Sequence, residues 1–492
     1  MTAGRPPAVE RAESPADAVD RLCARYEASV SRLREALDRY ARTGEGPALD
    51  AVSSGAFAYP ELRVIYRPSG PVPPISRSFG KFSAPGVYAV SITRPDFFRD
   101  YLIEQLEPLV EIYGAEIEVA TSALEIPYPY VMEADDADAL GAARDPAAVA
   151  GLFPTPDLRS IGDEVVDGDW VQPAGEPRPL ALFEAPRTDY SLQRLRHYTG
   201  TPFEHLQQYV LFTNYHRYVD AFIQWGVDQL KTSNDYQALS APGVMVTAED
   251  ADAVARVDAG PWRRHQMPAY HLMAPGRRGL SLVNIGVGPS NAKTITDHLA
   301  VLRPQCWLMI GHCGGLRHSQ RLGDYVLAHA YLRRDAVLDD VIPVEVPIPP
   351  IAEVQVALQE AAAEVTGQAG ETLKTRLRTG TVVTDADRNW ELRSSIEARR
   401  FNRSRAIAID MESATIAANG LRFRVPYGTL LCVSDKPMHG EPKLPGAASR
   451  FYQEAVSQHL QIGIEAMERL KRDGGAALHS RKLRAFDEPP FR

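Results

Sequence analysis

The first regular pattern along the chain is helical. After Ser14-Pro15, apolar residues recur at intervals of three and four, which predicts a long amphipathic helix. The residues of its apolar side are Val19, Leu22, Tyr26, Val30, Leu33, Leu37 and Tyr40. Residues 1–13 lack such a pattern, and we expect them to be disordered.

Strand-like runs follow this helix at 62–66, 87–92 and 116–120, with a helical stretch over 96–113 between the second and the third. This order of elements predicts a compact α+β domain. From 132 to 187 the composition shifts to Asp, Pro, Gly and Ala, which indicates a long connection with a few short ordered pieces. We therefore assign residues 14–185 to an N-terminal α+β domain that includes this connection.

The second half of the chain alternates apolar strand-like runs with helical stretches. The expected strands are 210–213, 244–247, 281–285, 307–310, 325–329, 378–384, 406–409 and 429–433. Helices at 291–302 and 413–422 would be right-handed crossovers, so we expect an α/β domain over 186–472 with a largely parallel sheet. A last helix over 450–472 would cover one face. The tail, 473–492, contains Gly-Gly and Pro-Pro, and we expect it to be disordered.

Length and composition fit this division. The chain has 492 residues, more than the roughly 250 to 300 at which a single core stops growing. Its 45% apolar and 24% charged residues are typical of a soluble globular protein. No run of about 18 apolar residues suggests a membrane span, and the first residues lack the apolar segment of a secretory signal. We therefore expect a cytoplasmic protein with no membrane partner.

Charge and cysteine usage narrow the partners further. The 54 basic and 63 acidic residues give a net charge of −9, which argues against nucleic acid and leaves a small anionic substrate compatible. The four cysteines, which we expect to be reduced thiols, are Cys23, Cys306, Cys313 and Cys432. His312, Cys313 and His318 lack convincing ligand spacing, so we predict no metal site.

Two acids carry the candidate chemistry. Glu412 begins a small-residue helix that directly follows an apolar strand, and Asp435 ends the strand expected at 429–433. In an open α/β sheet that edge is where ligands bind, so both acids are candidates for a pocket. The alternative for either acid alone is a helix-capping or first-turn role favoured by the helix dipole.

The segments Asp410-Met411-Glu412 and Ser434-Asp435 resemble the signature of the nucleoside phosphorylase and nucleosidase superfamily. Within it, the chain is most similar to the AMP nucleosidases, over nearly its whole length to about residue 470. The other segments that carry the resemblance are 195–202, 211–220, 283–293 and 309–315. The resemblance implies a mostly parallel mixed sheet flanked by helices, preceded by a smaller α+β domain with a regulatory or oligomerisation role.

The resemblance also implies roles for the two acids. Cleavage of a purine N-glycosidic bond leaves an oxocarbenium-like sugar and a poor leaving group, so it needs an acid beside the purine. Asp435 would protonate the ring N7, Glu412 would accept hydrogen bonds from the ribose hydroxyls, and Met411 would pack beneath the sugar. The further substrate-binding candidates are Trp390, Ser434, Gly314 and Arg450; Trp390 has core packing as its alternative and Arg450 an exposed helix position.

The 5′-phosphate of a nucleotide needs cationic or amide donors. Asn214 and Arg217 lie in the segment that matches the superfamily's anion loop. Arg196 and His197 precede the first strand of the domain, and we expect them to bind the 5′-phosphate held by a neighbouring protomer. The alternative for this pair is an ordinary basic helix end.

One departure from the phosphorylases bears on the reaction type. Where hexameric phosphorylases carry an arginine and a serine that hold inorganic phosphate, this chain has Met309 and His312. Water is therefore the expected nucleophile, with His312 positioning or deprotonating it, or serving only as a structural hydrogen-bonding group. This implies hydrolysis of AMP to adenine and ribose 5-phosphate. The alternatives are a purine nucleoside phosphorylase and a catalytically silent nucleotide sensor.

The resemblance implies no cofactor in catalysis, activation by MgATP, inhibition by phosphate, and a homo-oligomer, specifically a hexamer. A basic, turn-like stretch at residues 77–81 is one candidate for an effector site.

Overall fold

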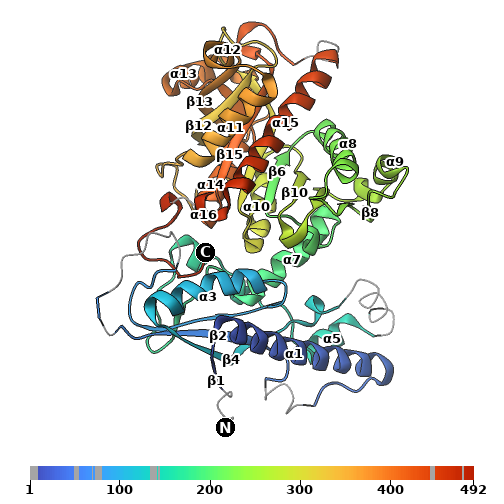
Figure 1. Ribbon diagram of the computed structural model, residues 1–492, viewed down its shortest axis with the longest axis vertical. Helices are drawn as coiled ribbons and strands as arrows, with labels where there is room; N and C mark the ends of the chain where they lie inside the picture. The colour runs from blue at the N-terminus through green and yellow to red at the C-terminus, as the bar shows by residue number, and fades with distance from the viewer. Residues whose placement is uncertain are drawn as a thin grey trace. The chain divides into compact units, whose positions relative to one another are not determined.

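A computed structural model describes residues 9–48, 55–68, 70–71, 80–132, 141, 144–443, 449–478 and 481–492 (Figure 1). The chain forms two units: Met1–Gln193 together with Arg484–Arg492, and Arg194–Leu483. The boundary at 193 falls inside helix α7 (Ala185–Thr199), eight residues beyond the expected end of the N-terminal domain at 185.

The first unit contains a five-stranded sheet and two long helices. The strand order is β1-β4-β2-β3-β5, and the elements are β1 (Glu10–Ala12), α1 (Pro15–Thr43), β2 (Ala58–Tyr66), β3 (Gly86–Ser91), α3 (Arg99–Tyr113), β4 (Glu116–Glu125), η1 (Tyr128–Tyr130), α5 (Pro146–Leu152), η2 (Leu158–Ser160), α6 (Glu164–Asp167) and β5 (Arg178–Pro179). The Ser14 hydroxyl caps α1 by accepting from the Asp17 N–H at 3.1 Å. The expected α+β order is confirmed, with β1 and β5 added at the sheet edges.

Both chain ends are more ordered than we expected. Residues 10–12 form β1, which pairs antiparallel with β4, so the expectation of disorder over 1–13 is wrong for the described residues. The described part of the tail is also ordered: Phe491 is 1% exposed, and its N–H donates to the Leu180 carbonyl at 3.0 Å. Composition suggested a flexible tail, but one buried aromatic ring and backbone hydrogen bonds fix its end within the first unit.

The second unit is built on a ten-stranded mixed sheet in the order β14-β13-β12-β15-β11-β6-β10-β9-β7-β8. Its strands are β6 (Tyr209–Thr213), β7 (Ala238–Ala241), β8 (Val244–Val246), β9 (Ala269–Met273), β10 (Leu280–Asn284), β11 (Cys306–Gly315), β12 (Tyr325–Arg334), β13 (Leu377–Asp385), β14 (Ala408–Asp410) and β15 (Tyr427–Asp435). The eight expected strands are confirmed. We did not expect β7 and β9, which extend the sheet in antiparallel pairing.

Helices flank this sheet. They are α8 (His216–Thr232), α9 (Ala253–Asp258), α10 (Pro289–Leu299), α11 (Ala352–Thr366), α12 (Gly370–Arg376), α13 (Ser394–Ser404), α14 (Ser413–Phe423), α15 (Ser449–Asp473) and α16 (Gly475–Leu478), with short 3₁₀ turns η3 (Phe203–His205), η4 (Pro261–Arg264), η5 (Pro275–Arg277), η6 (Ala300–Leu302), η7 (Trp390–Arg393), η8 (Pro437–His439) and η9 (Arg481–Leu483). In the part of the chain that the structure describes, no helix has the length and apolar character needed to cross a bilayer.

Strand register brings the two candidate acids to one place. β14 pairs parallel with β13 and antiparallel with β11, so β14, β13, β12, β15 and β11 close on themselves. At the end of β11, a bulge between Cys313 and Gly314 leaves Gly314 paired with Ile409 of β14 on one side and with Asp435 of β15 on the other. The end of β15 and the turn after β14 therefore meet at Gly314.

Candidate active site

A cavity of about 210 Å³ lies where these strands end. The predicted site residues that line it are Asn214, His312, Gly314, Trp390, Met411, Glu412, Ser434 and Asp435. The other lining residues are Tyr215, Val287, Cys313, Asp385, Arg388, Glu391, Ile409, Asp410 and Lys443. Most of the predicted site is thus gathered around one cavity in the second unit.

Glu412 is held from two sides. Its Oε1 accepts from the Gly288 N–H at 2.6 Å, and its Oε2 accepts from the Asn214 side-chain amide at 2.9 Å. Burial raises the pKa of Glu412, and the nearby Asp410 raises it further, whereas these two donors favour the ionised form. The carboxylate is therefore fixed in position and still borders the cavity.

Asp410 supports the turn that carries Glu412. Its carboxylate accepts from the Thr384 hydroxyl at 2.6 Å and from the Ser413 N–H at 2.9 Å, and the Ser413 hydroxyl also donates to it. Burial raises the pKa of Asp410, opposed by these hydrogen bonds. Asp410 thus accepts the hydrogen bond of a backbone N–H in the first turn of α14, which has no acceptor within the helix, and it fixes the geometry of the Met411-Glu412 segment.

Asp435 borders the same cavity from β15. The Ser434 hydroxyl donates to its Oδ1 at 2.5 Å. Burial raises the pKa of Asp435, with the Ser434 hydrogen bond and the charge of Lys443 acting in the opposite direction. A raised pKa favours the protonated carboxyl, which is the form a general acid requires.

His312 is buried on β11 in an aromatic environment. Its ring centroid lies 4.5 Å from that of Tyr215 and 5.5 Å from that of Tyr218. Burial lowers the pKa of His312 to about 3, and the neighbouring His459 and cations lower it further, so the imidazole is neutral near pH 7. A neutral imidazole can position a water molecule but supplies no charge to hold inorganic phosphate.

A buried chain of hydrogen bonds holds the Tyr218 ring beside the His312 ring. The Tyr218 hydroxyl lies 2.7 Å from His459 Nδ1, and His459 Nε2 lies 2.9 Å from the Leu430 carbonyl oxygen. Because a carbonyl only accepts, His459 carries its proton on Nε2, and Tyr218 donates to Nδ1. Tyr218 is thereby held against the His312 ring.

Lys443 and Arg388 line the cavity, and sequence reasoning missed both. The Lys443 ammonium donates to the Tyr215 hydroxyl and lies 4.7 Å from the centre of that ring. Lys443 follows the 3₁₀ turn η8, and Arg388 follows β13, in polar loops that lack any periodic pattern. The only available signal was that each loop follows a strand ending at this edge of the sheet.

Several predicted residues lie outside the cavity lining. Arg217 is exposed in the first turn of α8, although its charge contributes to the lowered pKa of His312. Arg196 and His197 are exposed near the end of α7. Arg450 belongs to α15, but its side chain lies outside the described part, as do residues 77–79 of the stretch considered for an effector.

Trp390 combines the two roles that its sequence context left open. It lines the cavity, and its ring packs edge-on against Phe401 with the centroids 5.4 Å apart. It belongs to a buried apolar cluster and is only 7% exposed. A ring fixed in this way can offer one edge or face to a planar base without moving.

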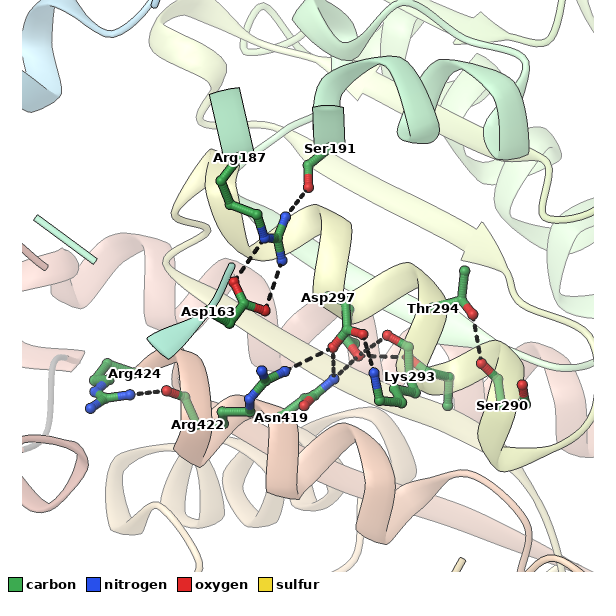
Figure 2. A network of polar contacts seen from close by, with 12 residues as sticks. Asp163, Arg187, Ser191, Ser290, Lys293, Thr294, Asp297, Asn419, Arg422 and Arg424 are labelled. Carbon is green, nitrogen blue, oxygen red and sulfur yellow. Dashed lines mark hydrogen bonds and ion pairs between the residues drawn. The ribbon is translucent and has the colours of Figure 1, made fainter. Parts of the chain in front are cut away.

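The two helices beside Glu412 are joined by a polar cluster (Figure 2). Asp297 of α10 accepts from Lys293 at 2.5 Å, from the Asn419 amide of α14 at 2.8 Å and from Arg422 at 3.2 Å. Gly288 directly precedes α10, and Glu412 directly precedes α14. By joining the two helices, this cluster helps to hold the Gly288 N–H within hydrogen-bond distance of the Glu412 carboxylate. Figure 2 also shows a separate cluster in the first unit, in which Arg187 pairs with Asp163.

Comparisons with known proteins agree with this architecture. Residues 17–177 match the family model described as the bacterial AMP nucleoside phosphorylase N-terminus, and residues 244–469 match the phosphorylase superfamily. The AMP nucleosidase of Escherichia coli (strain K12) is 58% identical over 97% of this chain and 98% of its own length. The 5'-methylthioadenosine/S-adenosylhomocysteine nucleosidase of Desulfotalea psychrophila is 24% identical over 39% of this chain and 81% of its own.

Among solved structures, the AMP nucleosidase from Bacteroides thetaiotaomicron VPI-5482 is 27% identical, covering 58% of this chain and 98% of its own, with a TM-score of 0.43.

Proposed function

The chain belongs to the AMP nucleosidase family, and from this premise we propose that it hydrolyses the N-glycosidic bond of AMP to adenine and ribose 5-phosphate in the cavity described above. The observation that supports this most directly is that Glu412 and Asp435 border a single cavity. A nucleoside placed there can meet one carboxyl at its sugar and the other at its base.

Asp435 is the proposed general acid. Its raised pKa favours a proton on the carboxyl, and donation of that proton to the purine N7 turns the base into a neutral leaving group. The Ser434 hydroxyl, which donates to Oδ1, orients the carboxyl so that the proton resides on the other oxygen. The site in this way supplies the acid that the leaving group needs.

Glu412 is the proposed ribose-binding group. Each of its oxygens already accepts one hydrogen bond, and a carboxylate oxygen has a second lone pair for a sugar hydroxyl. The negative charge also favours positive charge as it develops at C1′. Met411 lines the same cavity and supplies an apolar contact to the sugar.

Water is the proposed nucleophile. Asn214 donates its amide N–H to Glu412, and its Oδ1 is buried with no hydrogen-bond partner among the described residues. That oxygen is suited to accept from a water molecule held between Asn214 and the neutral His312. Gly311 permits this arrangement, because a Cβ there would lie 3.2 Å from Asn214 Oδ1 and 2.7 Å from Met309 Cε. Met309 offers no charge to an inorganic phosphate.

For the 5′-phosphate we propose Lys443 and Arg388 as donors from the same chain, since both line the cavity. Arg217, in the segment that matches the anion loop, remains a proposed donor, and Arg196 and His197 remain proposed donors to the phosphate held by a neighbouring protomer. Replacing Lys443 with Ala should raise the KM for AMP by about 10-fold or more while leaving that for adenosine within about twofold. An equal change in KM for AMP and for adenosine would show that Lys443 does not bind the 5′-phosphate.

We propose, from the family resemblance, that the protein is a cytoplasmic homohexamer that MgATP activates and phosphate inhibits, with no cofactor in the chemical step. Light scattering on the purified chain tests the hexamer. Initial rates at varied MgATP and phosphate test the regulation.

The test of the function itself is product analysis. Purified protein is incubated with AMP, adenosine or IMP, with and without inorganic phosphate, and the sugar product is identified. Hydrolysis predicts ribose 5-phosphate from AMP at a rate that does not require phosphate. A sugar 1-phosphate that forms only when phosphate is added would establish the phosphorylase alternative, and no product from any substrate would favour a silent sensor.

A further inference from the structure

A second, larger cavity of about 750 Å³ lies in the second unit. It is bordered by the loop between β11 and β12, by the end of α12 with the first residues of β13, and by α15. None of its lining residues lines the active-site cavity. Its volume lies in the range of about 300 to 1,000 Å³ that is usual for small-molecule sites.

Three arginines line this cavity: Arg321, Arg376 and Arg378. One carboxylate, Asp324, is also present; burial raises its pKa, and the charges of all three arginines act in the opposite direction. Across the described residues, no carboxylate oxygen lies within ion-pair distance of any of the three guanidinium groups. The cavity therefore gathers more positive charge than its own acid balances.

Two of the guanidinium groups are held in place. Arg376 donates to the Gln458 side chain at 2.6 Å and lies 5.1 Å from the centre of the Tyr325 ring. Arg378 donates to the Ser319 carbonyl at 3.1 Å through Nη2, while its buried Nε has no hydrogen-bond partner among the described residues. A guanidinium that is already held in place and borders the cavity can bind an anion without first losing conformational freedom.

We propose that this cavity binds an anion that carries phosphate groups. Guanidinium groups pair with phosphate oxygens through parallel N–H donors, and the hydroxyls of Ser319 and Thr372 supply further neutral donors along the same wall. A free phosphate and the phosphate chain of a larger metabolite share this chemistry.

The cavity is linked to the proposed acid by backbone hydrogen bonds. The Gly323 N–H donates to the Val433 carbonyl at 2.9 Å, and the Val433 N–H donates to the Asp324 carbonyl at 2.9 Å. Val433 lies two residues before Asp435 on β15. An anion that binds more tightly to one arrangement of the 319–324 loop than to another would therefore shift the position of Asp435.

The test is calorimetric titration of the full-length protein with inorganic phosphate and, separately, with tripolyphosphate. The variants are Arg321→Gln, which changes an exposed residue, and Arg378→Gln, each compared with Arg399→Gln on the exposed side of α13. We expect at least one probe to bind the parent protein, the two cavity variants to bind it about 10-fold or more weakly, and Arg399→Gln to match the parent.

Three results would overturn the proposal. The first is binding of neither probe to the parent. The second is binding that both cavity variants retain in full. The third is binding that Lys443→Ala abolishes and Arg321→Gln leaves intact, because that would place the anion in the active-site cavity. Circular dichroism of each variant shows whether it is folded, and Arg321→Gln decides the outcome if Arg378→Gln is not.

Discussion

Burial raises the pKa of both Glu412 and Asp435, but the proposed chemistry needs opposite protonation states of the two carboxyls. Glu412 has to be ionised to accept from the ribose hydroxyls, and Asp435 has to be protonated to act as an acid. The donors around each group favour this difference, although burial beside Asp410 still raises the pKa of Glu412 to about 8 before substrate binds. Glu412 receives a backbone N–H and an amide, which favour its charge, whereas Asp435 receives a single hydroxyl.

These shifts predict the pH dependence of AMP cleavage. The rate should fall as pH rises through the raised pKa of Asp435, because the acid loses its proton, and kcat/KM should fall as pH drops through the raised pKa of Glu412. His312, with a pKa near 3, stays neutral over this range and contributes neither limb. A plot of kcat/KM against pH should be bell-shaped, and Glu412→Gln should remove the fall on the acidic side of that profile. A rate that rises steadily through the alkaline range would contradict the assignment of Asp435.

At the scale of residues, sequence reasoning identified the site residues that lie directly at strand ends. It missed the residues of loops that fold back onto the cavity. Glu412, Asp435 and His312 follow from strand position and motif. Lys443 does not, because its place beside Tyr215 depends on how the chain turns after η8. Asp410 was part of the quoted motif, but its structural role depends on Thr384 and Ser413, which only the folded chain brings to it.

At the scale of elements, the position of Glu412 depends on how α10 packs against α14. Asp297 accepts from donors on both helices, and its side chain is 15% exposed. The cluster therefore joins α10, which follows Gly288, to α14, which follows Glu412; Figure 2 shows its hydrogen bonds.

Replacing Asp297 with Ala should destabilise the protein by about 3 kcal/mol, because it removes the carboxylate to which the buried Asn419 amide and the Arg422 guanidinium both donate. It should also raise the KM for AMP more than it lowers kcat, since the Gly288 donor and Glu412 lose their register. Thermal denaturation and steady-state kinetics check both effects, and Asp340→Ala, at an exposed acid, is the control. Unchanged kinetics in a destabilised variant would confine the cluster to a stabilising role.

Sequence patterns predicted elements well where burial was strong. The eight expected strands of the second unit are present, and their apolar runs are long enough to be distinct. β7 and β9 were missed because each is short and mixes apolar residues with Ser or His, so neither shows a continuous or alternating pattern. Nor does any local pattern reveal that β14 pairs with both β13 and β11, the pairing that brings Gly314 beside both strand ends.

At the scale of the whole molecule, the last residues of the chain belong to the unit that its first residues build. The Phe491 ring is buried with its centroid 6.1 Å from that of Tyr101, and the Arg492 N–H donates to the Gln105 side chain at 3.1 Å. The Pro-rich and charged composition of the tail hid this, because one aromatic residue near a chain end gives no periodic signal.

Replacing Phe491 with Ala should destabilise the first unit by about 3 to 5 kcal/mol, the usual cost of removing a buried aromatic ring. The matched control is Phe486→Ala, since Phe486 is fully exposed in the same tail and should contribute almost nothing. Chemical denaturation followed by circular dichroism measures both. Equal stability of the two variants would contradict the ordered placement of the tail.

The central claim is that Asp435 and Glu412 act on opposite sides of one glycosidic bond, and it is tested most directly by single-turnover and steady-state kinetics of Asp435→Asn with AMP. The asparagine keeps the shape of the side chain and its hydrogen bond with Ser434 but has no acidic proton. The account predicts a fall in kcat of about 100-fold or more with a nearly unchanged affinity for AMP, and a loss of affinity instead for Glu412→Gln. Full turnover by Asp435→Asn would contradict it.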